Sequence, residues 1–191
     1  MRVALHRLLA EMRLLRFAEA GTAAVEFALV LPIMLMLYIG FVEVSALITA
    51  DRKLQSASGA LGDLVARSDK TVPAATLEDY FKAAAGIMTP HPIDELEQIV
   101  TQVFVDEDGE ATVVWSREYR DGTMSVGSKY QQGDDFALPD AMAAIATDAN
   151  VIVAEGSYAY PPLYGFAFDQ TINLYRENFF MPRFGGSITI N

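Results

Sequence analysis

One stretch of sixteen residues without a charged side chain constrains this chain more than any other feature. It reads FALVLPIMLMLYIGFV and covers residues 27–42, and residues 23–50 as a whole are largely apolar. A helix needs roughly 20 such residues to cross a bilayer. A buried helix of a soluble protein is the alternative, but a helix this apolar on every face would need a larger protein around it. We therefore predict one transmembrane helix over residues 22–50.

Charge divides the chain into unlike regions. Residues 1–21 carry a net charge of +2, residues 22–50 carry −2, and the remaining 141 residues carry −11. An acidic domain without a basic stripe repels phosphate backbones, so nucleic acid is not expected as a partner. The chain has no cysteine, which excludes disulfides and thiolate metal sites but does not indicate a compartment.

The basic residues on either side of the apolar run do not orient the span. Four precede it and four follow it within about 20 residues, so the positive-inside rule gives a tie. Residues 1–21 also carry leucines and a methionine at helical spacing, a pattern typical of a helix on an anionic inner leaflet; an irregular basic tail is the alternative. The eight basic residues are Arg2, Arg7, Arg13, Arg16, Arg52, Lys53, Arg67 and Lys70.

A short motif joins this basic leader to the apolar run. Gly21 and Thr22 come first, and Glu26 and Phe27 follow four residues later. Gly21 offers a peptidase an unobstructed backbone, and we expect it to interrupt the helix, because glycine costs ~1 kcal/mol relative to alanine within one. The Glu26 carboxylate near the edge of a span indicates a function, or else reaches the headgroups. Pro32 removes one backbone donor and favours a kink.

The basic leader, the glycine, the glutamate five residues after it and the apolar stem resemble prepilins, which a membrane aspartyl peptidase cuts. The string GTAAVEFALVLP is especially similar to the TadE/TadG family of the Flp (tight-adherence) pilus system. This resemblance implies cleavage between Gly21 and Thr22. It also implies that Glu26, next to Phe27, pairs with the new α-amine of its own or a neighbouring subunit.

The resemblance further implies a place and a role for the chain. It would be a single-pass protein of the inner membrane, with its N-terminus in the cytoplasm and its head in the periplasm. It would act as a minor pilin or pseudopilin in pilus assembly or priming, not as an enzyme, and no cofactor or metal is expected. The implied partners are the prepilin peptidase, other pilins or pseudopilins and the inner-membrane assembly platform.

Three alternatives remain open. The first is a secretory signal peptide cut after Ala46, although its apolar core would be long for such a signal. The second is a single-span ligand-binding or sensor protein, for which the roughly 21 residues before the span provide no output domain. The third is a membrane-anchored hydrolase, which no GxSxG, phosphate-binding or zinc-binding motif supports.

The rest of the chain predicts an α+β head with mainly antiparallel strands. Residues 1–21 are the expected leader, residues 51–70 continue the helix as a stem to about Arg67, and residues 71–191 form the head. The acidic string after Val105 predicts a hairpin tip. Expected helices cover residues 76–88, starting at Thr76, and 140–147; expected strands cover 99–105, 111–119, 151–160 and 171–180.

Few side chains of the head suggest chemistry. His6 and His91 would lie on opposite sides of the membrane, so they are not expected to form one site. His91 lies between two prolines, which predicts a turn at this position. The acidic string Asp106–Glu110 does not fit a calcium loop, because Phe104 and Trp115 fall where acidic ligands belong. The many aromatic residues between 158 and 184 are expected to pack on a core, with an exposed interface as the alternative.

Overall fold

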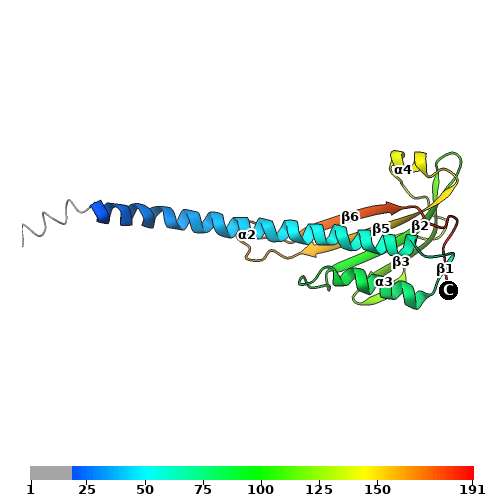
Figure 1. The fold of residues 1–191 in the computed structure, drawn as a ribbon, viewed down its shortest axis with the longest axis horizontal. Coiled ribbons are helices and arrows are strands. Elements are labelled where there is room, and N and C mark those ends of the chain that lie inside the picture. The colour runs from blue at the N-terminus through cyan, green and yellow to red at the C-terminus, as the bar shows by residue number, and fades with distance from the viewer. Residues whose placement is uncertain (1–18) are drawn as a thin grey trace, which may run out of the picture. The chain divides into compact units, whose positions relative to one another are not determined.

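A computed structural model describes residues 19–191 of the chain. Residues up to Val44 and residues Ser45–Asn191 belong to two separate compact units. One helix, α2 (Glu19–Ala66), contributes to both units (Figure 1). Residues 1–18 of the predicted leader, including His6, lie outside the described residues. We treat the two units separately below.

Helix α2 changes character along its length. Its first part is apolar all round, whereas from Ala50 onward buried residues recur at three- to four-residue spacing, which places them on one face. Leu54, Leu61 and Val65 are among these fully buried side chains. The helix ends at Ala66, so the prediction that it continues to about Arg67 is confirmed.

The unit of residues 45–191 is built on a five-stranded sheet. Every neighbouring pair is antiparallel, and β2 lies at the centre between β3 and β5. The predicted α+β fold with mainly antiparallel strands is therefore confirmed. Across the sheet the order is β4 (Thr123–Val126), β3 (Ala111–Arg120), β2 (Leu96–Val105), β5 (Ala149–Tyr160) and β6 (Ile172–Phe180).

Short elements complete this unit. Helix α3 (Ala74–Gly86) and the short helix α4 (Asp140–Ile145) lie close to their predicted positions. A small parallel pair, β1 (Thr71–Val72) with β7 (Thr189–Ile190), was not predicted. A strand of two residues is too short to show the alternation of apolar and polar residues by which strands are recognised in a sequence. The pairing also joins segments 118 residues apart, which no local pattern indicates.

Helix α3 begins differently from the prediction. Thr76 was expected to start it, but the helix starts at Ala74, and the residue before it, Pro73, makes no side-chain capping bond. The amide of Leu77 donates to the Pro73 carbonyl at 3.0 Å and closes the first turn. Proline has no side-chain group that could cap the helix, and before the first turn its missing amide hydrogen removes no helical hydrogen bond.

The two faces of the sheet have separate cores. On one face, the second part of α2 and helix α3 pack on the strands (Figure 1) through residues such as Leu54, Phe81 and Ile152. On the other face, Val103, Val151 and neighbouring valines pack against the segment between β4 and β5. Residues 152 and 151 point to opposite faces because side chains alternate along a strand.

His91 lies in the bend after α3, between that helix and the sheet. Its ring stands edge-on to the rings of Tyr158 and Tyr160, at centroid distances of 6.3 and 6.1 Å. Burial, and secondarily the positive charge of Lys53, lowers the pKa of His91 below its ordinary value. The folded protein therefore favours the neutral imidazole.

This gives a pH-dependence with a definite sign. Below about pH 6.5 the unfolded chain takes up a proton on His91 that the folded chain resists, so stability falls as the pH falls. We expect His91→Gln to show a smaller loss of unfolding free energy than the wild type between about pH 7.5 and 5.5. Denaturant titrations of both proteins at the two pH values measure this, and equal losses would contradict it.

Candidate functional site: the exposed helix and a buried carboxylate

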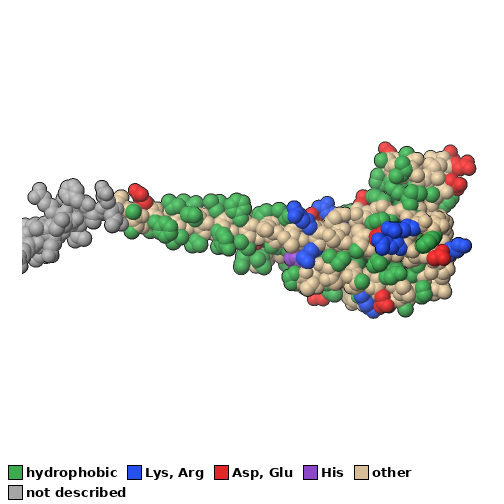
Figure 2. Space-filling model, in the orientation of Figure 1, with side chains coloured by type: hydrophobic (Ala, Val, Ile, Leu, Met, Phe, Trp, Pro, Cys, Tyr) green, Lys and Arg blue, Asp and Glu red, His purple; other side chains and the backbone are tan. Residues whose placement is uncertain are grey.

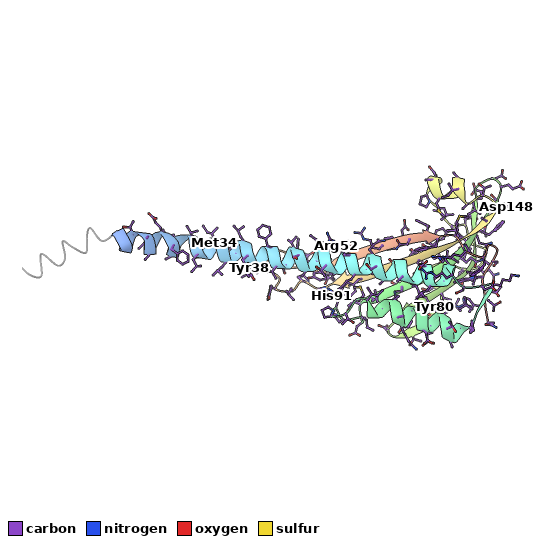
Figure 3. All side chains as sticks on the ribbon, viewed as in Figure 1. Met34, Tyr38, Arg52, Tyr80, His91 and Asp148 are labelled. Carbon is purple, nitrogen blue, oxygen red and sulfur yellow. The ribbon has the colours of Figure 1, made fainter. Side chains whose placement is uncertain are left out.

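The first unit exposes the apolar side chains of helix α2. Large residues from Val25 to Phe41 are mostly solvent-accessible, and none of the most apolar 18-residue window is buried. Met34 and Tyr38 project away from the helix (Figure 3), and hydrophobic side chains cover its surface (Figure 2). This is not the core helix of a soluble domain. Within the described residues, one helix is long and apolar enough to cross a membrane.

Gly21 and Thr22 lie within this helix. The prediction that Gly21 interrupts the helix is wrong, because α2 runs without a break from Glu19. A cost of ~1 kcal/mol at one position is small beside the favourable free energy of extending a long helix that is rich in alanine and leucine. A methyl group added at Gly21 would meet nothing within 4 Å. The glycine is therefore not required by packing in the described structure.

Glu26 and Phe27 follow one turn later, and both are exposed. The Phe27 side chain is 60% accessible. A carboxylate on an apolar helix is costly inside a bilayer unless it pairs or reaches the interface. Together the two residues present a charge and an aromatic ring at the start of the apolar surface.

Pro32 lies inside the helix, which continues through it. Proline has no amide hydrogen, so the carbonyl of Ala28, four residues earlier, loses its usual helical partner. The helix is nevertheless continuous from Glu19 to Ala66. The proline still marks the point of this segment where the backbone bonding is weakest.

A buried carboxylate in the second unit escaped the sequence analysis. Glu155 lies in the middle of β5 and is almost fully buried. Its Oε1 atom accepts hydrogen bonds from Lys129 Nζ at 2.6 Å, Tyr175 OH at 2.6 Å and Tyr130 OH at 3.2 Å. Its Oε2 atom has no hydrogen-bond partner within residues 19–191. The sequence does contain one sign of this site, because Glu155 is the one charged residue of an otherwise uncharged strand.

The surroundings of Glu155 keep the partner groups protonated. Burial first, and then the hydrogen bond to Glu155, raises the pKa of Tyr175 far above its ordinary value. Burial is the largest single effect on Lys129 and would lower its pKa, but the hydrogen bonds and charge interactions with Glu155 and Tyr130 together outweigh it, so the pKa is raised. Tyr175 is thus a hydroxyl donor and Lys129 a cation, so both stabilise the buried carboxylate.

Glu155 lies in the wall of a small recess on the sheet face that points away from α2. The recess has a volume of about 230 Å³ and is also lined by Glu97, Lys129, Ser157 and Tyr175. A second recess of about 400 Å³ shares Glu97 and Ser157. Two carboxylates, the Lys129 ammonium group, two hydroxyls and the Ile99 side chain line the first recess, so its surface is mostly polar and can offer hydrogen bonds to a small polar group.

The other residues singled out from the sequence have structural roles. Asp106 accepts hydrogen bonds from the amides of Asp108 and Glu110 and shapes the predicted hairpin tip between β2 and β3. Asp134 accepts a hydrogen bond from the amide of Gln131 in a loop. Across residues 19–191, no group of three or more histidine and carboxylate side chains is arranged to hold a metal ion.

The aromatic residues between 158 and 184 divide into two sets. Tyr158 and Tyr160 are buried between sheet and helices, as expected for a core. Tyr164, Phe166 and Phe184 are exposed, so the expectation that this whole segment packs on a core is wrong. The buried rings are on one face of β5. Tyr164, Phe166 and Phe184 lie in loops, where no alternation directs them inward, and Tyr175, which is 48% exposed, lies on β6 and donates a hydrogen bond to Glu155.

These features define a class of protein in which one helix able to span a membrane continues as the first helix of an α+β unit. Residues 21–60 match the model of the family described as TadE-like protein. The resemblance to the TadE/TadG family is therefore confirmed over 40 of the 191 residues. No curated protein and no solved structure matched the chain.

Proposed function

We propose that this chain is a minor pilin or pseudopilin that contributes to the assembly or priming of a Flp-type (tight-adherence) pilus. The observation that carries the proposal is the TadE-like match, which begins at Gly21 and includes Glu26 and Pro32. The exposed apolar surface of α2 supports it, since such a surface must be covered by lipid or by other helices. The TadE-like resemblance implies a structural role and not an enzymatic one.

The proposed maturation places each residue of the motif in a role. A prepilin peptidase cuts the Gly21–Thr22 bond and leaves a new α-amine with an ordinary pKa near 8. Glu26 then pairs with such an amine when the helices leave lipid and pack together, because a buried carboxylate needs a cationic partner. This transfer costs little hydrophobic free energy, because the lipid tails that the helix leaves and the helices that it contacts are similarly apolar. Pro32 helps the helix adapt to its new neighbours.

The proposed location follows from the same processing. The N-terminus before Thr22 lies in the cytoplasm, α2 spans the inner membrane, and the unit of residues 45–191 lies in the periplasm. Its partners are the peptidase, the other pilins or pseudopilins and the assembly platform in the inner membrane.

N-terminal sequencing of the membrane-associated protein tests this proposal. We expect the wild type to start at Thr22, and Gly21→Ala and a peptidase-deficient strain to accumulate the uncut chain. Gly40→Ala is the matched control, because it adds the same methyl group to the same helix and also meets nothing within 4 Å. Glu26→Ala is expected to be cut but to fail in assembly, as pilus counts would show.

Two other results would contradict the proposal in different ways. A start at Leu47 would identify a secretory signal peptide and release residues 47–191 as a soluble domain. An uncut chain in the wild type would leave a plain membrane anchor and favour the ligand-binding alternative. In that case the recess beside Glu155 is the first place to look for a ligand.

A further inference from the structure

The buried carboxylate of Glu155 has too few hydrogen-bond donors. Its side chain is only 3% accessible, and the three donors that reach it all bind the same oxygen, Oε1. The other oxygen, Oε2, accepts no hydrogen bond from any residue between 19 and 191. An unpaired oxygen on a buried carboxylate is costly, because the charge has left water without a full set of donors. The site therefore lacks at least one donor.

A second carboxylate lies directly across from the first. Glu177 of β6 is the antiparallel partner of Glu155 on β5, and like charges opposite each other on one face of a sheet repel. The Tyr175 hydroxyl oxygen lies 2.6 Å from Glu155 Oε1 and 3.0 Å from Glu177 Oε2. A hydroxyl has one proton, so Tyr175 donates to only one of the two carboxylates at a time.

The charges at this place are unbalanced in the same direction. Within residues 19–191, Lys129 is the cation paired with Glu155, with 2.6 Å between Nζ and Oε1. Glu97, which also lines the recess, is paired with Arg120. One positive charge thus faces the two carboxylates of Glu155 and Glu177, which leaves an excess of one negative charge. A group that corrects both deficits carries a positive charge and N–H donors.

The surroundings suit an ammonium group in particular. The Lys129 ammonium lies 4.7 Å from the ring centroid of Tyr130 and 5.5 Å from that of Tyr175, within the range of cation–π attraction. Tyr175 and the apolar side chain of Ile99 also line the recess, so they can pack against an alkyl chain. A metal ion is less suited, because no group of three or more histidine and carboxylate side chains within residues 19–191 is arranged to hold one.

We propose that the recess beside Glu155 binds a primary ammonium group, which donates a hydrogen bond to Glu155 Oε2. Lys129 and Tyr175 are each about half exposed, and exposed side chains change rotamer within nanoseconds. A rotation of either one opens Oε2 to a group in the recess. A free alkylamine and a lysine side chain of another protein both supply this group. The site lies within the residue 45–191 unit and does not depend on cleavage at Gly21.

Saturation-transfer NMR on the full chain in nonionic detergent micelles tests the site, with n-butylammonium as the probe. We expect transfer to the probe in the wild type and a several-fold loss in Glu155→Gln, which removes the charge. Glu107→Gln is the matched control, because it removes an exposed carboxylate at the hairpin tip, and it should bind as the wild type does. n-Butyltrimethylammonium has the same charge and chain but no N–H donor, so several-fold less transfer is expected.

Lys129→Ala provides a second test that does not rely on the folding of the Glu155 variant. Lys129 is half exposed and belongs to neither apolar core, and its removal makes the recess more negative. n-Butylammonium should therefore bind this variant several-fold more tightly than the wild type. Equal or weaker binding would contradict the proposal, and so would equal transfer in the wild type and a folded Glu155→Gln.

A blocked lysine peptide distinguishes the two sources of the ammonium group. If the peptide binds and loses binding in Glu155→Gln, the recess accepts a lysine side chain of another protein. If only the free amine binds in this way, the ligand is a small amine. If neither binds the wild type, the ammonium site is wrong, whereas a mature start at Thr22 would still support the proposed pilin-like function.

Discussion

Replacing Phe81 with alanine is expected to lower the free energy of unfolding of the residue 45–191 unit by about 3–5 kcal/mol. Phe81 is fully buried, and its ring stacks on that of Tyr119 with centroids 5.5 Å apart. It holds helix α3 on the sheet, and the cavity left by the ring lies between two rigid elements. Partial relaxation cannot fill a cavity of this size.

Equilibrium unfolding in detergent micelles, followed by Trp115 fluorescence, measures this loss. Trp115 is the single tryptophan of the chain, and its indole donates hydrogen bonds to Gln102 Oε1 and to the Ile188 carbonyl. Lys82→Ala is the control on the same helix, because Lys82 is half exposed and its ion pair with Glu78 lies at the surface, so little change is expected. Equal stabilities of the Phe81 and Lys82 variants would show that α3 is not part of the cooperative core.

Adding one methyl group to α2 is expected to affect stability differently at two glycines. At Gly62 the new Cβ would lie 2.4 Å from a Phe180 ring carbon and 2.9 Å from the Ala154 Cβ. At Gly59 the nearest atom is 4.0 Å away. Both changes remove the same helix penalty for glycine, ~1 kcal/mol, so it cancels in the comparison. Gly62→Ala should then be less stable than Gly59→Ala by about 1–3 kcal/mol, the usual range for overpacking.

The same fluorescence titration distinguishes the two variants. Gly59→Ala should exceed the wild type in stability, and Gly62→Ala should fall below Gly59→Ala. If the two variants have equal midpoints, the helix must dock on β5 and β6 less closely than the structure shows. Close docking matters for the proposed function, because α2 is the element that connects this unit to the membrane.

The sequence alone predicted the features that depend on local pattern. The apolar run at residues 27–42, the hairpin tip at Asp106 and the strand at 151–160 are each readable from consecutive residues, since hydrophobic period and turn chemistry act over a few positions. The resemblance to the TadE/TadG family likewise rested on one continuous string and is confirmed for residues 21–60. The cleavage between Gly21 and Thr22 stays a prediction.

Only the tertiary structure revealed what depends on contacts between distant segments. Lys129 and Tyr175 reach Glu155 from 26 and 20 residues away, and no local pattern encodes that meeting. Glycine disfavours helix, and the reason for Gly62 in α2 is visible only in the fold, where a Cβ at this position would meet Phe180 and Ala154. Strand pairing and helix docking bring such residues together because burial of apolar area acts without regard to sequence distance. For the same physical reason, a continuous string was sufficient to predict the membrane helix, whereas only the fold could reveal the buried carboxylate and its partners.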